Sequence, residues 1–371
     1  MAILIIPVSY LLAFYLRFSG AYEQANLESL LTSLPWLTLW GFLLLYIYDF
    51  LPYRRLDREE RLASIILVVA LQLLGGMALS FFLRSFAFPR TVFLLASIFQ
   101  LLGLWLSSHY RDQQLKSNFN DIICLPSHLT PTEQAIMILS AWQEGKNVEL
   151  IPTLEQLLVL GGKLERSGTE LRIILRPQVR MQGLKRLLDL IISLPLLLLL
   201  LPLFIIISIL VKIDSPGPIL YRQQRVTIGG KIFWLYKFRT MQVDAEAVTG
   251  PVLATKNDPR ITRIGKLLRR TRLDELPQLW NVFKGEMSLV GPRPERPEFV
   301  TIYQQKIPGY ELRHLMRAGL TGLAQVSAGY DLPVEEKLKY DLAYINSWSI
   351  WEDIKILFRT LRTIFLLNRA H

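Results

Sequence analysis

Cysteine is almost absent from this sequence: Cys124 is the single one among 371 residues. One cysteine excludes an internal disulfide, and it leaves neither a CxxC pair nor a Cys/His metal cluster. Soluble parts of the chain would therefore suit a reducing compartment such as the cytosol.

Acidic residues are scarce relative to basic ones, with 31 Asp and Glu against 42 Lys and Arg and a formal net charge of +11. A basic balance predicts nucleic acid, anionic lipid or a phosphorylated substrate as partner. A nucleic-acid binder would need a soluble basic face with exposed aromatic side chains. Here the charges cluster beside apolar runs, and 51% of the residues are hydrophobic. We therefore expect a protein that contacts membrane lipid, acts on phosphorylated substrates and binds no nucleic acid.

Four apolar runs fill most of the first 108 residues, at 2–18, 30–48, 62–83 and 92–106. Spanning about 30 Å of hydrocarbon takes about 20 helical residues, so the second and third runs are long enough and the other two are short. The first run has no cationic segment before it and no cleavage site, which indicates a mature membrane segment rather than a signal peptide. No run carries an ionisable residue near its centre, so we interpret the helices as an anchor rather than a transport pathway.

Arginines indicate which way these helices cross. Four of them gather in the loop between the second and third runs: Arg54, Arg55, Arg58 and Arg61. The positive-inside rule places that loop in the cytoplasm, and with it the chain after His109. Arg84 and Arg90 in the opposite loop weaken this assignment.

Residues 109–180 have the composition of a soluble domain. Strands and helices alternate along it, with strand-like segments at 121–126, 148–152 and 170–175 and helical ones at 133–145 and 154–168. Such alternation predicts a small α/β unit with a parallel sheet. No GxGxxG motif follows the first strand, because Gly161 and Gly162 fall inside a helical pattern. We interpret the unit as a spacer or regulatory domain rather than a nucleotide site.

A further apolar run, at 187–211, carries Pro202 near its middle. By length it could span a bilayer, but a proline inside a helix removes a backbone hydrogen bond and clashes with the preceding turn. Cations flank both ends, with Lys185 before the run and Lys212 after it, and the positive-inside preference puts both ends on one side. A re-entrant helix that bends at Pro202 satisfies both observations. A kinked spanning helix is the alternative.

Two alternating segments follow, joined at Gly229 and Gly230, and they predict a β-hairpin. The second segment carries Lys237 and Arg239 on one face. These side chains are either phosphate-binding or simply solvated, as most lysines and arginines are.

Two later segments have the pattern of amphipathic helices. Residues 260–272 place apolar side chains on one stripe and mostly basic ones on the other, which predicts an interfacial helix or a core-facing helix with a solvated basic face. Residues 349–370 set Trp, Ile, Phe and Leu against Arg and Lys. That helix either lies on a membrane or packs against the rest of its domain.

Asp274 and Glu275 are adjacent carboxylates three and two residues ahead of Pro277. Proline is tolerated in the first turn of a helix, so Asp274 falls at or just before a helix N-terminus. There the dipole favours an ionised carboxylate and attracts phosphate. An ionised Asp can be a nucleophile toward phosphorus or a magnesium ligand, and the Glu can supply the second function; alone, such a pair is more often a helix cap. Downstream, GPRP holds Arg293 on a stiff turn, as a clamp on phosphate oxygens requires.

Together these segments resemble the bacterial sugar transferases, the monotopic phosphoglycosyl transferases that start exopolysaccharide or O-antigen synthesis. The resemblance runs from Lys185 to about Thr363. It rests on KRLLD at Lys185, KIDSPGP ending at Pro218, YKFRTM at Tyr236, LDELPQLWNVFKGEMSLVGPRP at Leu273, GLTGLAQVSAG at Gly319 and YDLAYINSWSIWEDIKIL at Tyr340. The N-terminal helices and the unit at 109–180 resemble the long-form members, whose linker domain is Rossmann-like; here that unit is short and lacks the glycine motif.

The resemblance implies that a nucleoside-diphosphate sugar, such as a UDP-hexose, donates its sugar 1-phosphate to polyprenyl (undecaprenyl) phosphate, giving polyprenyl-diphospho-sugar and UMP. It implies that Asp274 is the nucleophile of a covalent phospho-sugar intermediate and Glu275 its catalytic partner, with Mg²⁺ at the pair neutralising the diphosphate. The remaining implied roles are phosphate binding by Lys237, Arg239 and Arg293, a place in the donor site for Arg317, and a break in the re-entrant helix at Pro202. Arg317 is followed by Ala318, where the family commonly has proline.

The predicted fold is an α+β membrane protein with a four-helix transmembrane region at 1–108, a degenerate Rossmann-like α/β unit at 109–180, and a catalytic domain at 181–371 with its re-entrant helix at 187–211. The expected location is the inner membrane, with the catalytic domain on the cytoplasmic face. A catalytically silent scaffold for polysaccharide assembly is the alternative, against which the intact candidate site argues. The sequence does not decide which sugar is transferred, and it leaves a homo-oligomer open.

Overall fold

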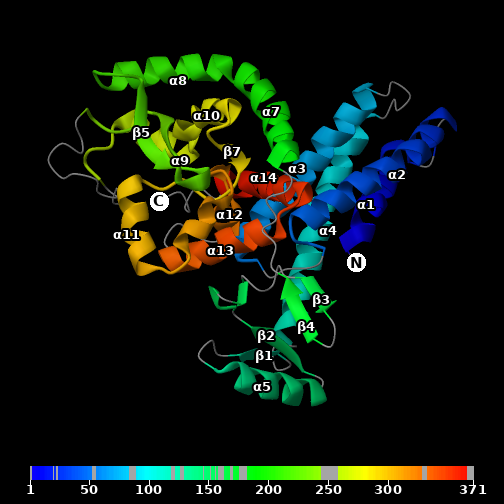
Figure 1. The fold of residues 1–371 in the computed structure, drawn as a ribbon. Coiled ribbons are helices and arrows are strands. Elements are labelled where there is room, and N and C mark those ends of the chain that lie inside the picture. Colours follow the sequence, from blue (N-terminus) through cyan, green and yellow to red (C-terminus); the bar gives the residue numbers. More distant parts are fainter. Residues whose placement is uncertain are drawn as a thin grey trace. The chain divides into compact units, whose positions relative to one another are not determined.

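The computed structural model describes residues 2–19, 21, 24–51, 56–82, 89–117, 122–125, 129–144, 146–150, 152–154, 156–157, 163–167, 170–174, 182–243, 258–327 and 332–365. Its contacts divide the chain into two compact units, Met1–Ile151 and Pro152–His371. Helices make up most of both units, with a few short strands (Figure 1).

Four apolar helices open the first unit: α1 (Ala2–Phe18), α2 (Gln24–Ile47), α3 (Arg58–Phe82) and α4 (Arg90–Ser117). By length and composition α2, α3 and α4 can each cross a membrane, whereas α1, with 17 residues, is shorter. α4 extends past the predicted end of its run at residue 106, because the polar segment that follows contains neither proline nor glycine to stop it. The chain is therefore a membrane protein, with three helices of spanning length among the described residues of this unit.

Side chains lock these helices to one another. Tyr10 of α1 meets Phe93 of α4 edge to face, with ring centroids 6.0 Å apart. Gln72 of α3 is buried and donates a hydrogen bond of 2.8 Å to the carbonyl of Leu37 in α2. A polar group inside an apolar bundle is stable when it is hydrogen-bonded in this way, so these contacts fix the packing of α1 to α4.

A βαβ element follows, formed by β1 (Ile122–Leu125), α5 (Pro131–Gln143) and β2 (Asn147–Leu150), and the two strands pair in parallel. Thr130 and Glu133 form a capping box at the start of α5, each side chain accepting from the other's backbone N–H. The parallel sheet predicted for 109–180 is therefore confirmed for its first two strands, but the third predicted strand, at 170–175, pairs antiparallel with another segment instead.

The predicted helix at 154–168 is wrong in its second half. In the second unit β3 (Lys163–Ser167) and β4 (Glu170–Ile174) pair as antiparallel strands. The sequence has a turn signal at its Ser-Gly pair, 167–168, which conflicts with the helix-like spacing of the leucines before it. Gly161 and Gly162 lie outside the described residues.

The apolar run that contains Pro202 forms two helices, α7 (Gln182–Leu199) and α8 (Leu201–Asp214), bent by 60° at Leu200. The break lies where it was predicted, but Pro202 sits in the first turn of α8 rather than in a helix interior. In that position the missing N–H leaves no hydrogen bond unmade. The pair has the length and composition of one broken span or of a re-entrant loop.

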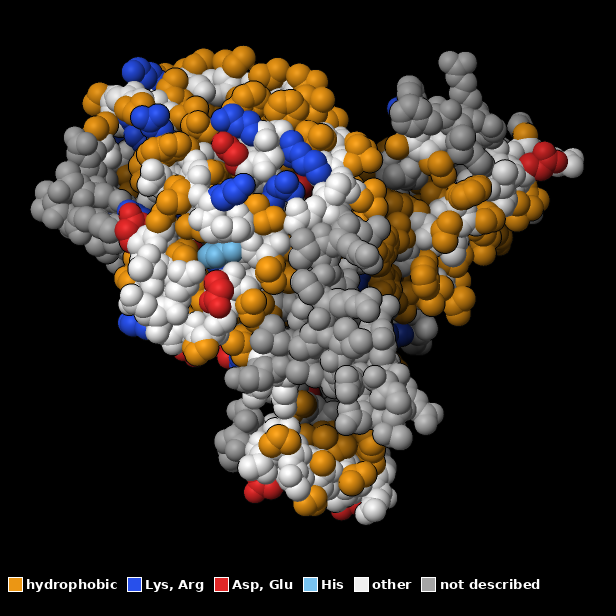
Figure 2. All heavy atoms as spheres, viewed as in Figure 1, with side chains coloured by type: hydrophobic (Ala, Val, Ile, Leu, Met, Phe, Trp, Pro, Cys, Tyr) orange, Lys and Arg blue, Asp and Glu red, His pale blue; other side chains and the backbone are white. Residues whose placement is uncertain are grey.

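Apolar side chains cover the outer face of this bent pair. The most exposed are Ile213, Leu199, Leu198, Ile191 and Ile205. Figure 2 shows hydrophobic side chains gathered over α7 and α8 along one edge of the unit. A patch of this extent on an otherwise folded domain indicates contact with a membrane.

The predicted hairpin is confirmed as β5 (Leu220–Val226) paired antiparallel with β6 (Ile232–Phe238), with Tyr221 opposite Lys237. The predicted amphipathic helix is α9 (Arg263–Thr271). A Cβ on Gly265 would come within 2.1 Å of the carbonyl oxygen of Thr240. Glycine at this position therefore lets α9 press directly against the chain that leaves β6.

After α9 the chain forms a 3-10 turn (Leu273–Glu275), α10 (Gln278–Lys284), β7 (Ser288–Val290), α11 (Pro297–Lys306), a second 3-10 segment (Tyr310–Leu315), β8 (Gly319–Thr321), α12 (Leu323–Ser327), α13 (Val334–Ser347) and α14 (Ile350–Phe365). β7 and β8 pair in parallel. The core collects buried side chains from these elements, among them Val282, Met287, Tyr310, Leu338 and Ile356. The C-terminal helix α14 therefore packs into the domain.

Two buried polar side chains of α7, Lys185 and Asp189, bind this helix to the core. Lys185 donates to Asp353 Oδ2 at 2.6 Å and to the Tyr344 hydroxyl at 2.9 Å. One turn later, Asp189 Oδ1 accepts from the Ser288 hydroxyl at 3.0 Å and from the backbone N–H of Leu289 at 2.9 Å. The start of α7 is thereby held to α14 and to β7.

Candidate active site

The adjacent carboxylates Asp274 and Glu275 lie in the 3-10 turn between α9 and α10. Arg272 just before them has φ of 56°, in the left-handed region, which is uncommon for a residue other than glycine. This conformation ends α9 and turns the chain inward, so that Asp274 is only 8% exposed. Pro277 caps α10, which confirms that Asp274 lies just ahead of a helix N-terminus.

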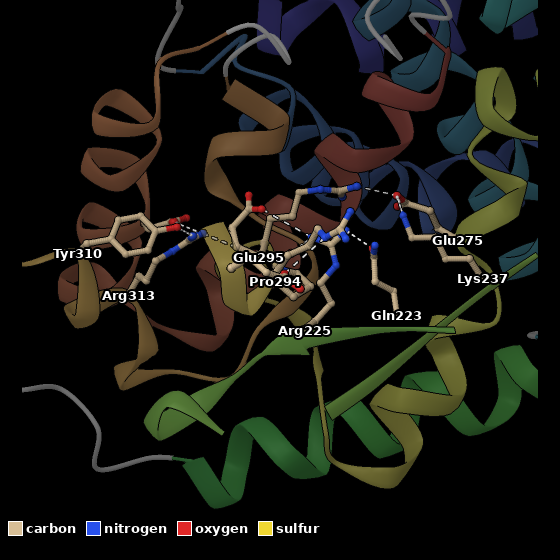
Figure 3. A network of polar contacts seen from close by, with 12 residues as sticks. Gln223, Arg225, Lys237, Glu275, Pro294, Glu295, Tyr310 and Arg313 are labelled. Carbon is tan, nitrogen blue, oxygen red and sulfur yellow. Dashed lines mark hydrogen bonds and ion pairs between the residues drawn. The ribbon is translucent and has the colours of Figure 1, made fainter. Parts of the chain in front are cut away.

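Two cations hold Glu275 from different parts of the chain. Arg293 donates from Nη2 to Glu275 Oε1 at 2.7 Å, and Lys237 Nζ lies 3.5 Å from the same oxygen. Figure 3 shows Lys237 beside Glu275 at one end of a larger polar network. Burial alone would raise the pKa of Glu275, but Arg293 and Lys237 together hold it well below its usual range. Glu275 is therefore a fixed anion that positions both cations.

Asp274 has the opposite electrostatic character. Its carboxylate accepts no hydrogen bond from the residues that the structure describes, and burial raises its pKa to about 6, with Glu275 acting in the same direction and Lys237 opposing. As the pH falls, Asp274 is therefore protonated before Glu275. At neutral pH Asp274 is mostly ionised. The pattern of one engaged and one free carboxylate suits nucleophilic chemistry.

Arg269 belongs to this site although sequence reasoning did not select it. Its Nε donates to the Thr240 hydroxyl at 2.9 Å, and its positive charge lowers the pKa of Asp274. The basic stripe of residues 260–272 included it, but periodicity could not decide which of the consecutive Arg269 and Arg270 turns toward the carboxylates.

Arg239 and Arg317 are not in contact with the carboxylates. Arg239 donates from Nη2 to the carbonyl of Ser215 at 2.6 Å and to its hydroxyl at 2.9 Å. Arg317 donates from Nε to the carbonyl of Gly285 at 3.1 Å. Among the cations predicted to bind phosphate, the structure thus brings together Lys237 and Arg293 with the acidic pair and leaves the other two apart from it.

The departure at Ala318 has a structural explanation. Its backbone N–H donates to the Thr227 hydroxyl at 3.1 Å, and that hydroxyl donates to the carbonyl of Glu286 at 2.9 Å. A proline at this position would have no N–H to donate. Alanine therefore adds a hydrogen bond between the residue just before β8 and the turn after β5.

The GPRP turn is held by two further arginines that sequence reasoning missed. Arg225 of β5 donates from Nη1 to the carbonyl of Pro294 at 3.1 Å, and Arg313 donates from Nη2 to the carbonyl of Arg293 at 2.9 Å. Arg313 is itself fixed by a buried ion pair of 2.8 Å with Asp341. Figure 3 shows this network running from Arg313 through Arg225 toward Glu275. The position of Arg293 is therefore set by its backbone as well as by its side chain.

The donor set limits how a metal ion could bind. Among the described residues there is no group of three or more His, Cys, Asp or Glu side chains able to hold one. Mg²⁺ is commonly bound by one or two carboxylates that share it with substrate phosphates and water. The free carboxylate of Asp274, beside Glu275, fits an ion that arrives with a phosphorylated substrate rather than a resident metal.

Comparison with known proteins agrees with the family resemblance of the sequence motifs. Residues 180–366 match the family model described as bacterial sugar transferase. The UDP-N-acetylgalactosamine-undecaprenyl-phosphate N-acetylgalactosaminephosphotransferase of Aeromonas hydrophila is 45% identical over 166 residues, 44% of this chain and 39% of that protein. The UDP-glucose:undecaprenyl-phosphate glucose-1-phosphate transferase of Klebsiella pneumoniae is 44% identical over 192 residues, 50% of this chain and 41% of that protein.

The UDP-glucose:undecaprenyl-phosphate glucose-1-phosphate transferase of Caulobacter vibrioides is 40% identical over 233 residues, 60% of this chain and 81% of that protein. The chain thus spans less than half the length of the first two relatives and most of the third. Since the matched region covers half of the chain and contains the bent helix pair, the acidic pair and its cations, this chain belongs to the bacterial sugar transferase family.

Proposed function

We propose that this protein transfers a sugar 1-phosphate from a UDP-sugar to undecaprenyl phosphate, releasing UMP at the first membrane step of exopolysaccharide or O-antigen synthesis. The observation that carries this proposal is the asymmetric acidic pair: a buried, unengaged Asp274 next to a Glu275 that holds Lys237 and Arg293. The printed names of the relatives describe transfers of this class, which supports the proposal.

In the first step a carboxylate oxygen of Asp274 attacks the phosphorus that carries the sugar. The new bond joins that oxygen to phosphorus, and the bond to the bridging oxygen breaks, so UMP leaves with the electron pair. Lys237 and Arg293 lie beside the nucleophile, where they stabilise the negative charge that develops on phosphate oxygens. Asp274 and Glu275 would hold a magnesium ion, which would supply further neutralisation of charge on the leaving group.

In the second step an oxygen of the lipid phosphate attacks the same phosphorus and displaces the carboxylate of Asp274. The product is undecaprenyl-diphospho-sugar, and the free carboxylate is regenerated. Glu275 stays ionised throughout because its two cations hold its pKa low, so it keeps Lys237 and Arg293 in place in both steps. Splitting the transfer into two displacements is the basis of covalent catalysis.

The bent pair α7–α8 places this chemistry at the membrane. In this proposal it is a re-entrant element that enters and leaves by the cytoplasmic face of the inner membrane, and three features support that arrangement. The helices meet at 60°, their exposed surface is apolar, and a cation lies at each end of the pair, Lys185 in the first turn of α7 and Lys212 in the last turn of α8. The catalytic domain then meets a lipid-borne acceptor at the interface.

The activity is tested with the purified full chain in nanodiscs, a panel of UDP-sugars, undecaprenyl phosphate and magnesium, by measuring released UMP. We expect one or more sugars to support release, Asp274→Asn to abolish it and Glu275→Gln to leave at most a trace. Glu336→Gln removes a carboxylate that pairs with Lys339 on the surface of α13 and serves as the matched control with unchanged rate. No UMP from any sugar would favour the silent scaffold.

The covalent step has its own test. Enzyme given UDP-sugar and magnesium without lipid acceptor should gain one sugar-phosphate mass on the peptide that contains Asp274, and double-reciprocal plots should be parallel. Intersecting plots without an adduct would indicate direct transfer in a ternary complex.

A further inference from the structure

A cavity of about 410 Å³ lies at the open end of the β5–β6 hairpin, next to the end of α8. Its lining residues are Pro218, Leu220, Tyr221, Arg222, Tyr236 and Arg239. Its two charged residues differ in setting. Arg222 is exposed and its guanidinium lies 5.2 Å from the centre of the Trp234 ring, whereas Arg239 is only 6% exposed. The cavity thus combines an apolar and aromatic wall with one buried cation.

Arg239 has donors that the fold does not use. Its Nη2 bonds to Ser215, but Nε and Nη1 are buried and have no hydrogen-bond partner among the described residues. Buried cationic donors are almost always paired, because an unpaired one is costly. Gly217 lies against this guanidinium. Its φ is 118°, and an added Cβ would come within 2.2 Å of Arg239 Nη1. The backbone therefore passes close to the guanidinium without covering it with a side chain.

The cavity connects to the acidic pair through two neighbours. Tyr221 in its wall is the cross-strand partner of Lys237, and Lys237 lies 3.5 Å from Glu275. Thr240, which follows Arg239, accepts the hydrogen bond of Arg269, the arginine whose charge lowers the pKa of the catalytic aspartate. A group bound at Arg239 would therefore lie close to Lys237, which is two residues earlier in the chain and pairs with Glu275.

The other side of the cavity meets the apolar surface of the bent helix pair. Ile213 at the end of α8 is 78% exposed, and Leu220 in the cavity wall is 46% exposed. Lys212 Nζ donates to the carbonyl of Gly217 at 3.1 Å, which holds the connecting turn against α8. A ligand with a phosphate at one end and a long apolar tail at the other fits this arrangement, since its tail can continue along α8.

We propose that Arg239 binds the phosphate of the lipid acceptor, and that the acceptor's prenyl tail leaves past Leu220 along the exposed face of α8. A phosphate monoester supplies several charged oxygens, which pair well with the fork of a guanidinium. This assignment rests on the proposed function and refines it: Arg293 and Lys237 serve the phosphates at the reacting centre, while Arg239 holds the incoming acceptor. The water-soluble nucleotide donor has no need of an apolar exit.

The two half-reactions separate these roles. Full-length Arg239→Gln in phosphatidylcholine nanodiscs should form the phospho-sugar adduct from UDP-sugar at the wild-type rate. Discharge of that adduct by undecaprenyl phosphate should need an acceptor concentration about tenfold higher, the size expected when charge-assisted hydrogen bonds are lost. Slow adduct formation with normal discharge would overturn the proposal and assign Arg239 to the donor.

Two variants separate binding from a structural role of Arg239. Ser215→Ala removes the hydroxyl that Arg239 uses within the fold but leaves Nε and Nη1 in place, so it should discharge like wild type. Equal impairment in Ser215→Ala would show that Arg239 acts only by shaping the turn. Should Arg239→Gln fail to fold, Leu220→Glu decides: this residue is exposed, and a carboxylate there should raise the acceptor requirement, whereas wild-type discharge would overturn the tail path.

Direct binding keeps this inference distinct from the proposed function. Farnesyl phosphate added to Asp274→Asn protein should bind, as followed by phosphorus NMR, and adding Arg239→Gln should weaken binding about tenfold. Binding that depends on Arg239 in a protein that never releases UMP would refute the proposed function alone; full turnover with binding that ignores Arg239 would refute this inference alone.

A bulk phospholipid could supply the same phosphate chemistry, so the discharge assay is repeated in phosphatidylglycerol nanodiscs. The change of lipid should alter the acceptor concentration that the wild type needs no more than it alters the concentration that Arg239→Gln needs. A rise in the wild type that Arg239→Gln abolishes would assign the cavity to bulk headgroups and overturn the proposal.

Discussion

Replacing Lys185 with methionine removes the cation that pairs with Asp353 inside the second unit. Lys185 is 3% exposed and Asp353 1% exposed, and Nζ lies 2.6 Å from Oδ2. In the variant the carboxylate keeps two neutral donors among the described residues, the Tyr344 hydroxyl at 2.6 Å and the Trp348 indole N–H at 3.2 Å. Removing one partner of a buried ion pair typically costs about 3–5 kcal/mol, because the other charge stays buried without compensation.

For a unit of this size each kcal/mol lowers Tm by about 2–4 °C, so Lys185→Met should lower Tm by about 6–20 °C. Thermal unfolding of the purified full chain in detergent, followed by tryptophan fluorescence, measures the shift. The double variant Lys185→Met/Asp353→Asn should recover most of the loss, since asparagine is neutral and still accepts hydrogen bonds.

Lys339→Met is the matched control, because its pair with Glu336 is partly exposed on α13 and contributes at most about 1 kcal/mol. The reasoning fails if Lys185→Met unfolds within about 2 °C of wild type, or if the double variant loses the sum of the two single losses. Either result would mean that Asp353 does not depend on Lys185 for its charge.

Three further perturbations test the helix bend, the acidic pair and the arginine clamp. Single cysteines at Gly183 and Ser215, in a background without the native cysteine, should react with an impermeant thiol reagent from the cytoplasmic side only. Pro202→Ala should move part of the Ser215 signal to the far side. If the two cysteines are instead labelled from opposite faces when Pro202 is present, the run is a true span. Because burial raises the pKa of Asp274 to about 6, adduct formation should fall as the pH drops through that value. The folded state should gain stability over the same window, since a raised carboxyl pKa favours the protonated native form; a rate unchanged down to about pH 4, the ordinary pKa of aspartate, would contradict this. Arg293→Lys keeps the charge but loses the planar fork, so kcat should fall by about 10²–10³ without a matching loss of Tm, and an unchanged kcat would remove the clamp role.

Short-range signals were sufficient to predict the elements that carry the acidic pair. Pro277 so soon after Asp274 required a helix start, and the alternation on either side of Gly229 and Gly230 required a hairpin that presents Lys237. Each of these signals acts within a few residues of the chain. The helix predicted at 154–168 was wrong in its second half for the same reason, because there a local turn signal and a helical spacing conflicted.

Long-range consequences were harder to predict. Lys237 and Arg239 share one face by the twofold period of a strand, yet only Lys237 approaches Glu275, while Arg239 turns to Ser215 beyond the end of β6. No sequence feature marks Arg225 as part of this network, and its contact with the carbonyl of Pro294 joins residues far apart in the chain. Periodicity specifies a face, whereas tertiary packing decides which side chain on that face reaches the site.

Asp189 joins α7 to β7 through the hydroxyl of Ser288 and the N–H of Leu289, and β7 leads directly into the turn that carries Arg293. In the proposed arrangement, the depth of α7 in the lipid is transmitted to that arginine through buried contacts, with no flexible linker between them. A bilayer whose hydrocarbon thickness does not match an embedded helix costs fractions of a kcal/mol per Å. Here that mismatch would act on the geometry of the catalytic clamp. If the proposed function holds, the turnover rate should thus depend on the acyl-chain length of the surrounding lipid.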